Sequence, residues 1–271
     1  MAHGPDTDEL LRMIRQCSGK ILDVSDLNIR SMPSLPSTLK NLSCINSYIT
    51  ELPPLPSTLK YLYCNYTYIT ELPQLPNSLI WLDCDTTQIT KLPQLPDTLK
   101  TLVCDDTNIT ELPPLPDTLK TLYCNDTNIT ELPPLPDTLE TLSCNNTNIT
   151  ELPQLPDSLK YLCCVDTNIT ELPPLPDTLE TLWCSNTNIT ELPPFPDTLE
   201  DLDCSDCPLI LQRKQGETVQ DYNARWEEWR EKKRIQERCM AVRDDLLAAA
   251  LHPNRIERLI NTHGIEVLDI M

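Results

Sequence analysis

A 20-residue period runs through most of this chain and constrains its fold more than any other feature. A single repeat of this length cannot bury its apolar side chains alone, so its stability must come from stacking on its neighbours. The sequence therefore predicts a solenoid of ten repeats over residues 19–208. The period is marked by a leucine that recurs ten times: Leu22, Leu42, Leu62, Leu82, Leu102, Leu122, Leu142, Leu162, Leu182 and Leu202.

The repeat has the pattern L-x-x-L-x-C-x-x-T-x-I-x-x-L-P-x-L-P-x-x, and we number its positions 1 to 20, starting for example at Leu59. Its x-Leu-x-Cys core alternates apolar and variable residues, as a strand with one buried face does. Stacked copies predict a parallel β-sheet on the concave side of the solenoid, with strands about 4.8 Å apart. The leucine and cysteine point inward, and the variable residues are exposed.

The second half of the repeat predicts a turn and a thin return. We expect Thr67 and its equivalents to hydrogen-bond the turn backbone, while Ile69, Leu72 and Leu75 fill the interior. The Leu-Pro-Pro-Leu-Pro segment cannot be α-helical, because each proline lacks a donor and restricts the residue before it. It predicts an extended, polyproline-like convex side. Asp-Thr or Ser-Thr before each new leucine supplies turn chemistry.

This pattern resembles the leucine-rich repeat, with cysteine replacing an aliphatic residue at position 6 and threonine replacing asparagine at position 9. With its L-P-x-L-P signature, it is most similar to the short, proline-rich repeats of effectors secreted by enteric bacterial pathogens. The resemblance covers residues 19–208. It implies a leucine-rich-repeat solenoid and a role in binding proteins.

The two ends of the chain depart from the repeat. Residues 1–18 predict an N-terminal helical cap, because Leu10, Leu11 and Ile14 have helical spacing between Thr7 and Cys17. Residues 209–271 predict a helical segment that either caps the last repeat or docks a second partner. Helical stretches there are marked by these apolar residues: Val219, Tyr222, Trp226 and Trp229; then Leu246, Leu247 and Leu251; then Ile256, Leu259 and Ile260.

The tail also carries a second resemblance. Its Cys207-Pro208-Leu209 start, its Trp226-Glu-Glu-Trp229 segment and its His252-Pro253 step resemble the ends of leucine-rich-repeat proteins encoded by large DNA viruses of amoebae. This resemblance implies a viral protein made in the host cytoplasm. It does not identify a partner.

The charge distribution bears on the class of partner. The formal net charge is −20, and residues 1–208 account for all of it. An acidic array repels phosphate backbones, so no nucleic-acid partner is expected. Residues 1–15 lack the layout of a signal peptide, and no apolar run reaches membrane-spanning length. The sequence therefore predicts an intracellular protein without a membrane partner.

The 13 cysteines raise the question of catalysis or metal binding. Cys204-Ser-Asp-Cys207 has no second cysteine pair nearby, and His3, His252 and His263 lack metal-binding spacing. Cys-x-Asp resembles the catalytic motif of ubiquitin ligases fused to the bacterial repeats, but Cys204 is expected to be a buried rung. We therefore expect no enzyme activity, cofactor or metal. Nine cysteines share position 6 and predict a reduced, buried structural ladder: Cys44, Cys64, Cys84, Cys104, Cys124, Cys144, Cys164, Cys184 and Cys204.

The candidate partner-binding residues interrupt an otherwise repetitive surface of Thr, Asn, Ser and Asp. Clustered aromatic side chains on a rigid surface are typical of interface hot spots, and acidic residues between them can steer a basic partner. The alternative is cross-strand ring stacking that only stabilises the sheet. The candidates are: Tyr48, Tyr61, Tyr63, Tyr66, Tyr68, Trp81, Asp83, Asp85, Asp105, Tyr123, Tyr161 and Trp183.

These observations favour a non-enzymatic protein–protein interaction module that binds a partner on its concave face. The partner remains unidentified, with a basic host protein among the options. One alternative is an adaptor linked to ubiquitin transfer, which would need a reactive thiol at Cys207, Cys239 or Cys163. Another is a structural or self-associating protein, for example in a virion. The oligomeric state is left open.

Overall fold

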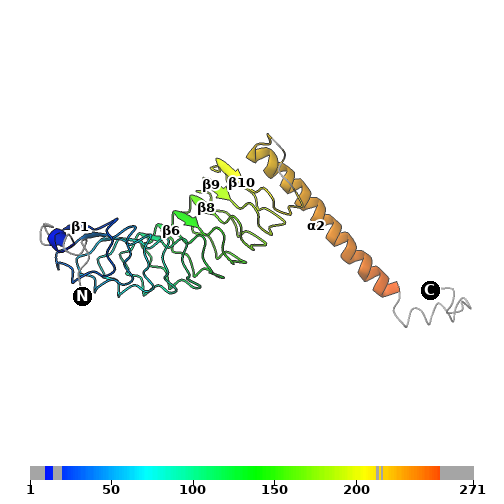
Figure 1. Cartoon of the computed structure of the whole chain (residues 1–271). Coiled ribbons are helices and arrows are strands. Elements are labelled where there is room, and N and C mark those ends of the chain that lie inside the picture. The colour runs from blue at the N-terminus through cyan, green and yellow to red at the C-terminus, as the bar shows by residue number, and fades with distance from the viewer. Residues whose placement is uncertain (1–9, 15–19, 212–213, 215, 251–271) are drawn as a thin grey trace, which may run out of the picture. The chain divides into compact units, whose positions relative to one another are not determined.

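The protein is described here from a computed structural model, which covers residues 10–14, 20–211, 214 and 216–250, with only the backbone for 241–250. Ten short strands within these residues form one parallel sheet, whose order follows the chain from β1 to β10 (Figure 1). The strands are β1 (Ile21–Asp23), β2 (Asn41–Ser43), β3 (Tyr61–Tyr63), β4 (Trp81–Asp83), β5 (Thr101–Val103), β6 (Thr121–Tyr123), β7 (Thr141–Ser143), β8 (Tyr161–Cys163), β9 (Thr181–Trp183) and β10 (Asp201–Asp203).

The register of the sheet confirms the 20-residue repeat as the structural unit. Each strand pairs with the next at equivalent positions, so that Leu62 lies opposite Leu82 and Tyr61 opposite Trp81. In the third repeat, Leu62, Cys64 and Ile69 are fully buried, with no exposed surface. The core is therefore a continuous stack of leucine, cysteine and isoleucine that runs from the second to the ninth repeat.

The proline-rich return has the expected form. Residues 70–76 and their equivalents contain neither helix nor strand within the described residues. Leu72 and Leu75 nevertheless point inward, since they are 8% and 4% exposed. The return thus contributes apolar side chains to the core while its prolines stay outside the hydrogen-bonding ladder.

A hydroxyl at position 9 closes the turn after eight of the ten strands, as predicted for Thr67 and its equivalents. The buried Thr67 hydroxyl donates to the carbonyl of Cys64 at 2.7 Å. Because a buried carbonyl without a partner is destabilising, this bond repeats along the array. The same bond is made by Ser47, Thr87, Thr107, Thr127, Thr147, Thr167 and Thr187.

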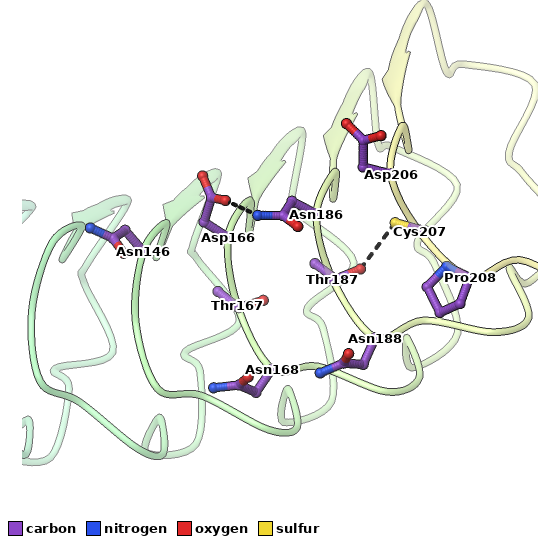
Figure 2. Close-up of a pocket in the computed structure, with 10 residues that line it drawn as sticks. All are labelled: Asn146, Asp166, Thr167, Asn168, Asn186, Thr187, Asn188, Asp206, Cys207 and Pro208. Carbon is purple, nitrogen blue, oxygen red and sulfur yellow. Dashed lines mark hydrogen bonds between the residues drawn. The ribbon is translucent and has the colours of Figure 1, made fainter.

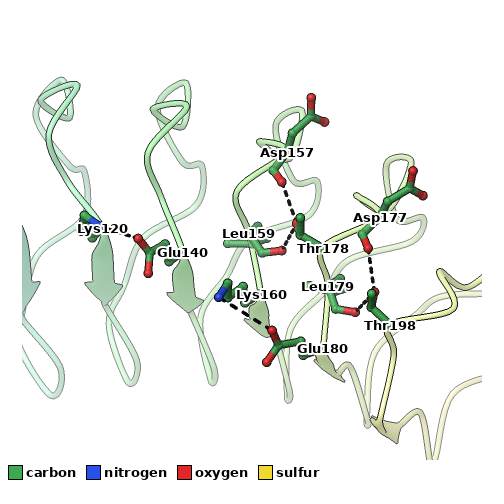
Figure 3. Close-up of polar contacts among 10 residues, drawn as sticks. All are labelled: Lys120, Glu140, Asp157, Leu159, Lys160, Asp177, Thr178, Leu179, Glu180 and Thr198. Carbon is green, nitrogen blue, oxygen red and sulfur yellow. Dashed lines mark hydrogen bonds and ion pairs between the residues drawn. The ribbon is translucent and has the colours of Figure 1, made fainter.

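The threonine at position 20 joins consecutive repeats. The Thr178 hydroxyl lies within hydrogen-bond distance of two carbonyls one turn of the solenoid earlier, that of Asp157 in the preceding repeat at 2.7 Å and that of Leu159 at the start of its own repeat at 2.8 Å (Figure 3). Thr198 makes the same two contacts with Asp177 and Leu179. The residue predicted to shape a turn therefore also holds neighbouring turns together.

The first and last parts of the array differ in how well they are covered. Residues 10–14 form a helical turn with Leu10 buried, which confirms that part of the predicted N-terminal helix; residues 7–9 and 15–17 lie outside the described residues. At the other end, Cys204 is only half-buried, so the prediction of a buried rung was wrong at this position. No described strand pairs with the outer edge of β10, which leaves the last rung partly uncovered.

The C-terminal residues form a second unit, which begins at Arg213. Its helix α2 (Val219–Ala250) is one element of 32 residues, whereas the sequence predicted two separate stretches there. Residues 219–250 contain no glycine or proline and are rich in helix-forming residues, so nothing interrupts the helix. The predicted stretch around Ile256–Ile260 lies outside the described residues.

The start of α2 is stabilised by local polar contacts. Thr218 caps the helix, because its hydroxyl accepts the Asp221 amide at 3.1 Å. Glu217 pairs with Arg225 at 2.7 Å, and this pairing holds the pKa of Glu217 down at about 2. Tyr222 and Trp226 are buried on the predicted apolar face. Of the described helices, none is long and apolar enough to span a membrane.

Replacing Thr127 by valine tests the turn bond. The Thr127 hydroxyl is buried and donates to Cys124 at 2.8 Å, so Thr127→Val leaves that carbonyl without this partner. We expect a loss of about 1–3 kcal/mol in unfolding free energy, measured as a lower urea midpoint. Thr127→Ser is the control, because Ser47 makes the bond naturally. Equal midpoints for the valine and serine variants would contradict this role.

Candidate functional site

Seven of the candidate residues project from the exposed face of the sheet, here called the sheet face. They lie at positions 3 and 5 of the repeat, on either side of the buried leucine at position 4. Most of them are half-buried, because neighbouring strands bring their side chains into contact. These residues are Tyr61, Tyr63, Trp81, Asp83, Tyr123, Tyr161 and Trp183.

The first aromatic cluster comprises Tyr61, Tyr63 and Trp81 on β3 and β4. Tyr61 pairs in register with Trp81, and the rings of Tyr63 and Trp81 lie 6.1 Å apart at 41°. The indole Nε1 of Trp81 is buried and has no hydrogen-bond partner among the described residues. A buried donor without an acceptor is unfavourable, and native proteins seldom leave one unpaired. This cluster therefore has unused hydrogen-bonding capacity.

Two ionisable side chains of this region, Asp83 and Tyr63, lie opposite each other on neighbouring strands. Asp83 is opposite Tyr63 in the sheet, and burial raises the pKa of its carboxyl to about 6, with Asp85 adding to the effect. The Asp85 amide donates to Asp83 at 3.3 Å and partly offsets that rise. Burial is the main cause that raises the pKa of Tyr63 as well, and the negative charge of Asp83 is the next. No basic side chain is among the groups that shift the pKa of Asp83.

A second carboxyl with similar properties lies in the next repeat. Burial raises the pKa of Asp105 to about 6, although its Oδ1 accepts the Asn125 amide at 2.6 Å. Asp85 and Asp126 raise it further by like-charge repulsion. The predicted acidic residues are thus brought together at the ends of successive strands, in an environment that favours a positive neighbour.

In the second aromatic set, which comprises Tyr123, Tyr161 and Trp183, only the last two rings are in contact. Tyr161 and Trp183 meet edge-to-face at 5.6 Å, and the Trp183 indole donates to Asp201 at 3.0 Å. Tyr123 lies two strands away from Tyr161, with Ser143 on the strand between them. This set is already satisfied within the protein and fits a stabilising role for the sheet.

The remaining candidates follow the strands instead of lying on them. Tyr48 and Tyr68 occupy position 10, and Tyr66 occupies position 8, in the turn after the strand. Their side chains are 51%, 55% and 55% exposed, and the rings of Tyr48 and Tyr68 stack at 5.8 Å. They line a groove of about 450 Å³. The aromatic residues predicted as one region therefore divide between the sheet face and this tyrosine groove.

The turn residue at position 8 has a positive φ in all ten repeats. Asparagine or aspartate, which tolerate this conformation, occupies the position in eight repeats. The exceptions are Tyr66, with a φ of 56°, and Thr86, with a φ of 49°. Both line the tyrosine groove. The break in the Asn/Asp pattern was visible in the sequence, but its meaning depends on the backbone angle.

Toward the C-terminal end of the array, the corresponding turns form a polar groove of about 780 Å³ (Figure 2). Asn186 donates to Asp166 between neighbouring turns. Cys207 takes the place of the position 9 threonine, and its thiol donates to the Cys184 carbonyl at 3.0 Å. Hydrogen bonding with the Cys184 thiol lowers the pKa of Cys207 to about 6. The sequence presented Cys207 as half of a Cys-x-x-Cys motif and missed this structural role.

The cysteine ladder is confirmed as a structural feature. From Cys44 to Cys184 its thiols are free and fully buried. The Cys64 thiol donates weakly to the carbonyl of Asp83 in the next repeat, at 3.3 Å. Burial raises the pKa of Cys44 to about 12, which keeps that thiol protonated and unreactive.

Solved structures with a similar architecture place this arrangement in a known class. The structure of YopM from Yersinia enterocolitica WA-314 is 37% identical, with a TM-score of 0.69, over 69% of this chain and 42% of its own. The array is a leucine-rich-repeat solenoid. A structure of YopM from Yersinia pestis, described as a leucine-rich effector protein, is 28% identical with a TM-score of 0.67, over 75% of this chain and 66% of its own.

The cysteine ladder also has a counterpart among these structures. The functional domain of InlJ from Listeria monocytogenes, described as including a cysteine ladder, is 31% identical with a TM-score of 0.66. It matches 72% of this chain and 46% of its own, so the chain covers between 42% and 66% of these three structures. No protein-family model matches the sequence, and no curated protein matches it significantly.

Thr86 tests the strain in the tyrosine groove. A β-branched residue with positive φ is unfavourable, so Thr86→Asn should stabilise the array by about 0.5–1 kcal/mol. The measurement is the urea midpoint. Gln88→Asn changes an exposed residue in the same groove and should shift the free energy by less than about 0.5 kcal/mol. A lower midpoint for Thr86→Asn would contradict the strain.

Asp83 tests the raised pKa values on the sheet face. Its pKa of about 6 exceeds the value of about 3.9 expected in the unfolded chain. The folded state therefore binds more protons between these pKa values, and stability falls as pH rises through this window. Asp83→Asn should remove that decline and add about 1 kcal/mol at pH 7, after allowance for solvent screening.

The control for this experiment is Asp97→Asn, which changes an exposed carboxyl at position 19. Urea midpoints of wild type and both variants at about pH 4 and pH 7 complete the comparison. A gain for Asp83→Asn that is as large at pH 4 as at pH 7 would show that burial of the charge is not its cause.

Proposed function

We propose that the protein is a non-enzymatic interaction module, and that the sheet face around Tyr61, Tyr63 and Trp81 binds a protein partner. The observation that carries this proposal is the aromatic cluster itself, in which the rings of Tyr63 and Trp81 lie 6.1 Å apart and the Nε1 of Trp81 has no acceptor among the described residues. Ring stacking that only stabilised the sheet would account for the contact between Tyr63 and Trp81. It would not by itself account for large rings placed on an otherwise repetitive surface of Thr, Asn, Ser and Asp.

The charges beside the cluster favour a basic partner. Asp83 and Asp105 are held partly buried with pKa values of about 6, without a compensating cation. A lysine or arginine from a partner would favour their charged forms and recover part of the cost of burying them. Binding should therefore weaken as the pH falls below about 6, as these carboxyls take up protons.

The related folds agree with a binding role. One leucine-rich-repeat neighbour, FLRT2, was solved in an octameric complex with Latrophilin 3 and Unc5D, although at 18% identity it shows the fold alone. The twelve cysteines in the described residues are free, which suits the reducing cytoplasm. With the tail's resemblance to proteins of amoeba-infecting viruses, these facts lead us to propose a host protein as the partner.

A link to ubiquitin transfer is less well supported. Cys163 is 1% exposed and Cys207 is 8% exposed, so neither thiol is accessible to a bulky substrate. Cys239, the third of these candidates, is exposed on α2. It has no neighbouring base or acid in a catalytic arrangement among the described contacts, and we propose no reaction there.

Capture of partners from host-cell lysate tests the proposal. Wild-type protein should retain a partner that Tyr61→Ala/Tyr63→Ala/Trp81→Ala loses, because truncation removes the aromatic contact area. The milder Trp81→Phe keeps an aromatic ring and removes the N–H. It should not lower stability through a lost hydrogen bond, because this N–H has no acceptor among the described residues, and it should weaken the captured complex by about tenfold.

Tyr161→Ala/Trp183→Ala is the matched control, since it removes a ring pair of similar size from the same face. It should retain the partner once circular dichroism has shown that every variant is folded. Recovery of the same proteins by wild type and the triple variant would move the binding site away from Trp81.

A further inference from the structure

Position 2 of the repeat, directly before each strand, carries an ordered row of charges that the proposed binding site does not use. Residues 1–208 contain ten basic residues, and six of them lie at this one position. We call this row the charged edge. In chain order it consists of Lys20, Lys40, Lys60, Ile80, Lys100, Lys120, Glu140, Lys160, Glu180 and Glu200.

The residues of the charged edge are neighbours in space. The amide of Lys60 donates to the carbonyl of Lys40 at 2.7 Å, and that of Glu180 donates to Lys160 at 2.8 Å. Successive positions are thus one strand spacing, about 4.8 Å, apart. Like charges at this separation repel each other, so a run of lysines here is unfavourable unless a negative group faces it.

Part of the edge is neutralised within the chain. Lys120 pairs with Glu140 at 2.5 Å, and Lys160 approaches Glu180 at 3.8 Å (Figure 3). Among the described residues, Lys40, Lys60 and Lys100 have no such partner within ion-pair distance. These three lysines are exposed, and they lie in the N-terminal half of the array.

The charge is segregated along the edge. Position 2 is basic or apolar up to Lys120, and three of its four residues from Glu140 onward are acidic. Position 19, at the turn just before it, follows the same trend. It is neutral at Ser37, Ser57 and Asn77, and then acidic and exposed from Asp97 to Asp197. The edge therefore has a basic end and an acidic end.

A row of this kind is complementary to itself when a second copy runs antiparallel. With the two-fold axis at Lys120, Lys40 faces Glu200 of the second copy, Lys60 faces Glu180, and Lys100 faces Glu140. Symmetry forms each contact twice. If the second copy is shifted by one repeat in either direction, only two kinds of opposite-charge contact form. Lysines other than Lys120 then face lysines of the other copy. At the axis, Lys120 faces Lys120 of the second copy, and its pairing with Glu140 within its own chain offsets the repulsion of this one like-charge contact.

We propose that two copies of this protein associate antiparallel along the charged edge, with Lys60 and Glu180 as the defining contact. A second copy fits better than a uniform polyanion such as RNA, because a polyanion would match the basic end and be repelled by the acidic end. The second copy also has the same repeat spacing, so the charges stay in step along the interface. The association is electrostatic and therefore sensitive to salt.

Sedimentation of the full-length protein at two ionic strengths provides the first test. At about 0.01 M salt, where charges interact over about 30 Å, we expect dimers. At about 0.15 M, where that range falls to about 8 Å, the dimer should dissociate more readily. A monomer at low salt, or a dimer that does not respond to salt, would overturn the proposal.

Charge reversal then tests the register. Lys60→Glu alone, or Glu180→Lys alone, should weaken the dimer by about tenfold or more, because each change affects two symmetry-related contacts. Mixing the two single variants should restore dimers as heterodimers, since each chain supplies the charge that the other needs. The double variant Lys60→Glu/Glu180→Lys should form homodimers again.

Lys91→Glu is the control, because it changes the net charge by the same amount as Lys60→Glu at position 13, where Lys91 pairs with Glu111. It should leave the dimer intact. Equal weakening by Lys60→Glu and Lys91→Glu, or failure of the mixed single variants to associate, would show that total charge and not this register governs association.

Discussion

The hydrogen bond from the position 9 hydroxyl to the position 6 carbonyl is the contact on which the rest of the array depends. It closes the turn after eight of the ten strands, so that Thr67 holds Cys64 in one repeat as Thr127 holds Cys124 in another. That turn requires a positive φ at position 8. Because the turn has the same form in successive repeats, each strand is placed one strand spacing from the last. Strand register, core stacking and the spacing of surface charges all follow from it.

Much of this architecture could be predicted from the sequence because the same residue pattern recurs in each repeat. The inward leucine, cysteine and isoleucine and the hydroxyl of Thr67 were predicted correctly, since alternation and proline chemistry are local properties. The burial of Cys204 was predicted wrongly, because it depends on which residues cover the last strand. The continuity of α2 was also missed, since two apolar stretches were read as two helices, although the residues between them are equally compatible with a helix.

The candidate site shows the same division between local and tertiary information. The tyrosines and Trp81 stood out as departures from a repetitive surface, and the sequence could name them. Only the structure shows that Trp81 Nε1 is buried with no acceptor in the described part of the chain, and that burial raises the pKa of Asp83. The Cys207 thiol illustrates the reverse case, in which a suggestive spacing belongs to a buried thiol that donates to the Cys184 carbonyl of the preceding repeat. The sequence pattern identified the positions of the candidate residues. The surroundings of each residue in the structure determine its chemistry.

The uniform stacking has a consequence for how such a gene can change. Because every repeat contacts its neighbours through the same bonds, duplication or loss of one whole repeat leaves the fold intact at most junctions. The junction between β3 and β4 is different, since Tyr63 and Trp81 belong to adjacent repeats and meet across it. An insertion there would preserve the solenoid and separate the two rings. Variation in length should therefore be tolerated widely along the array and selected against at this junction.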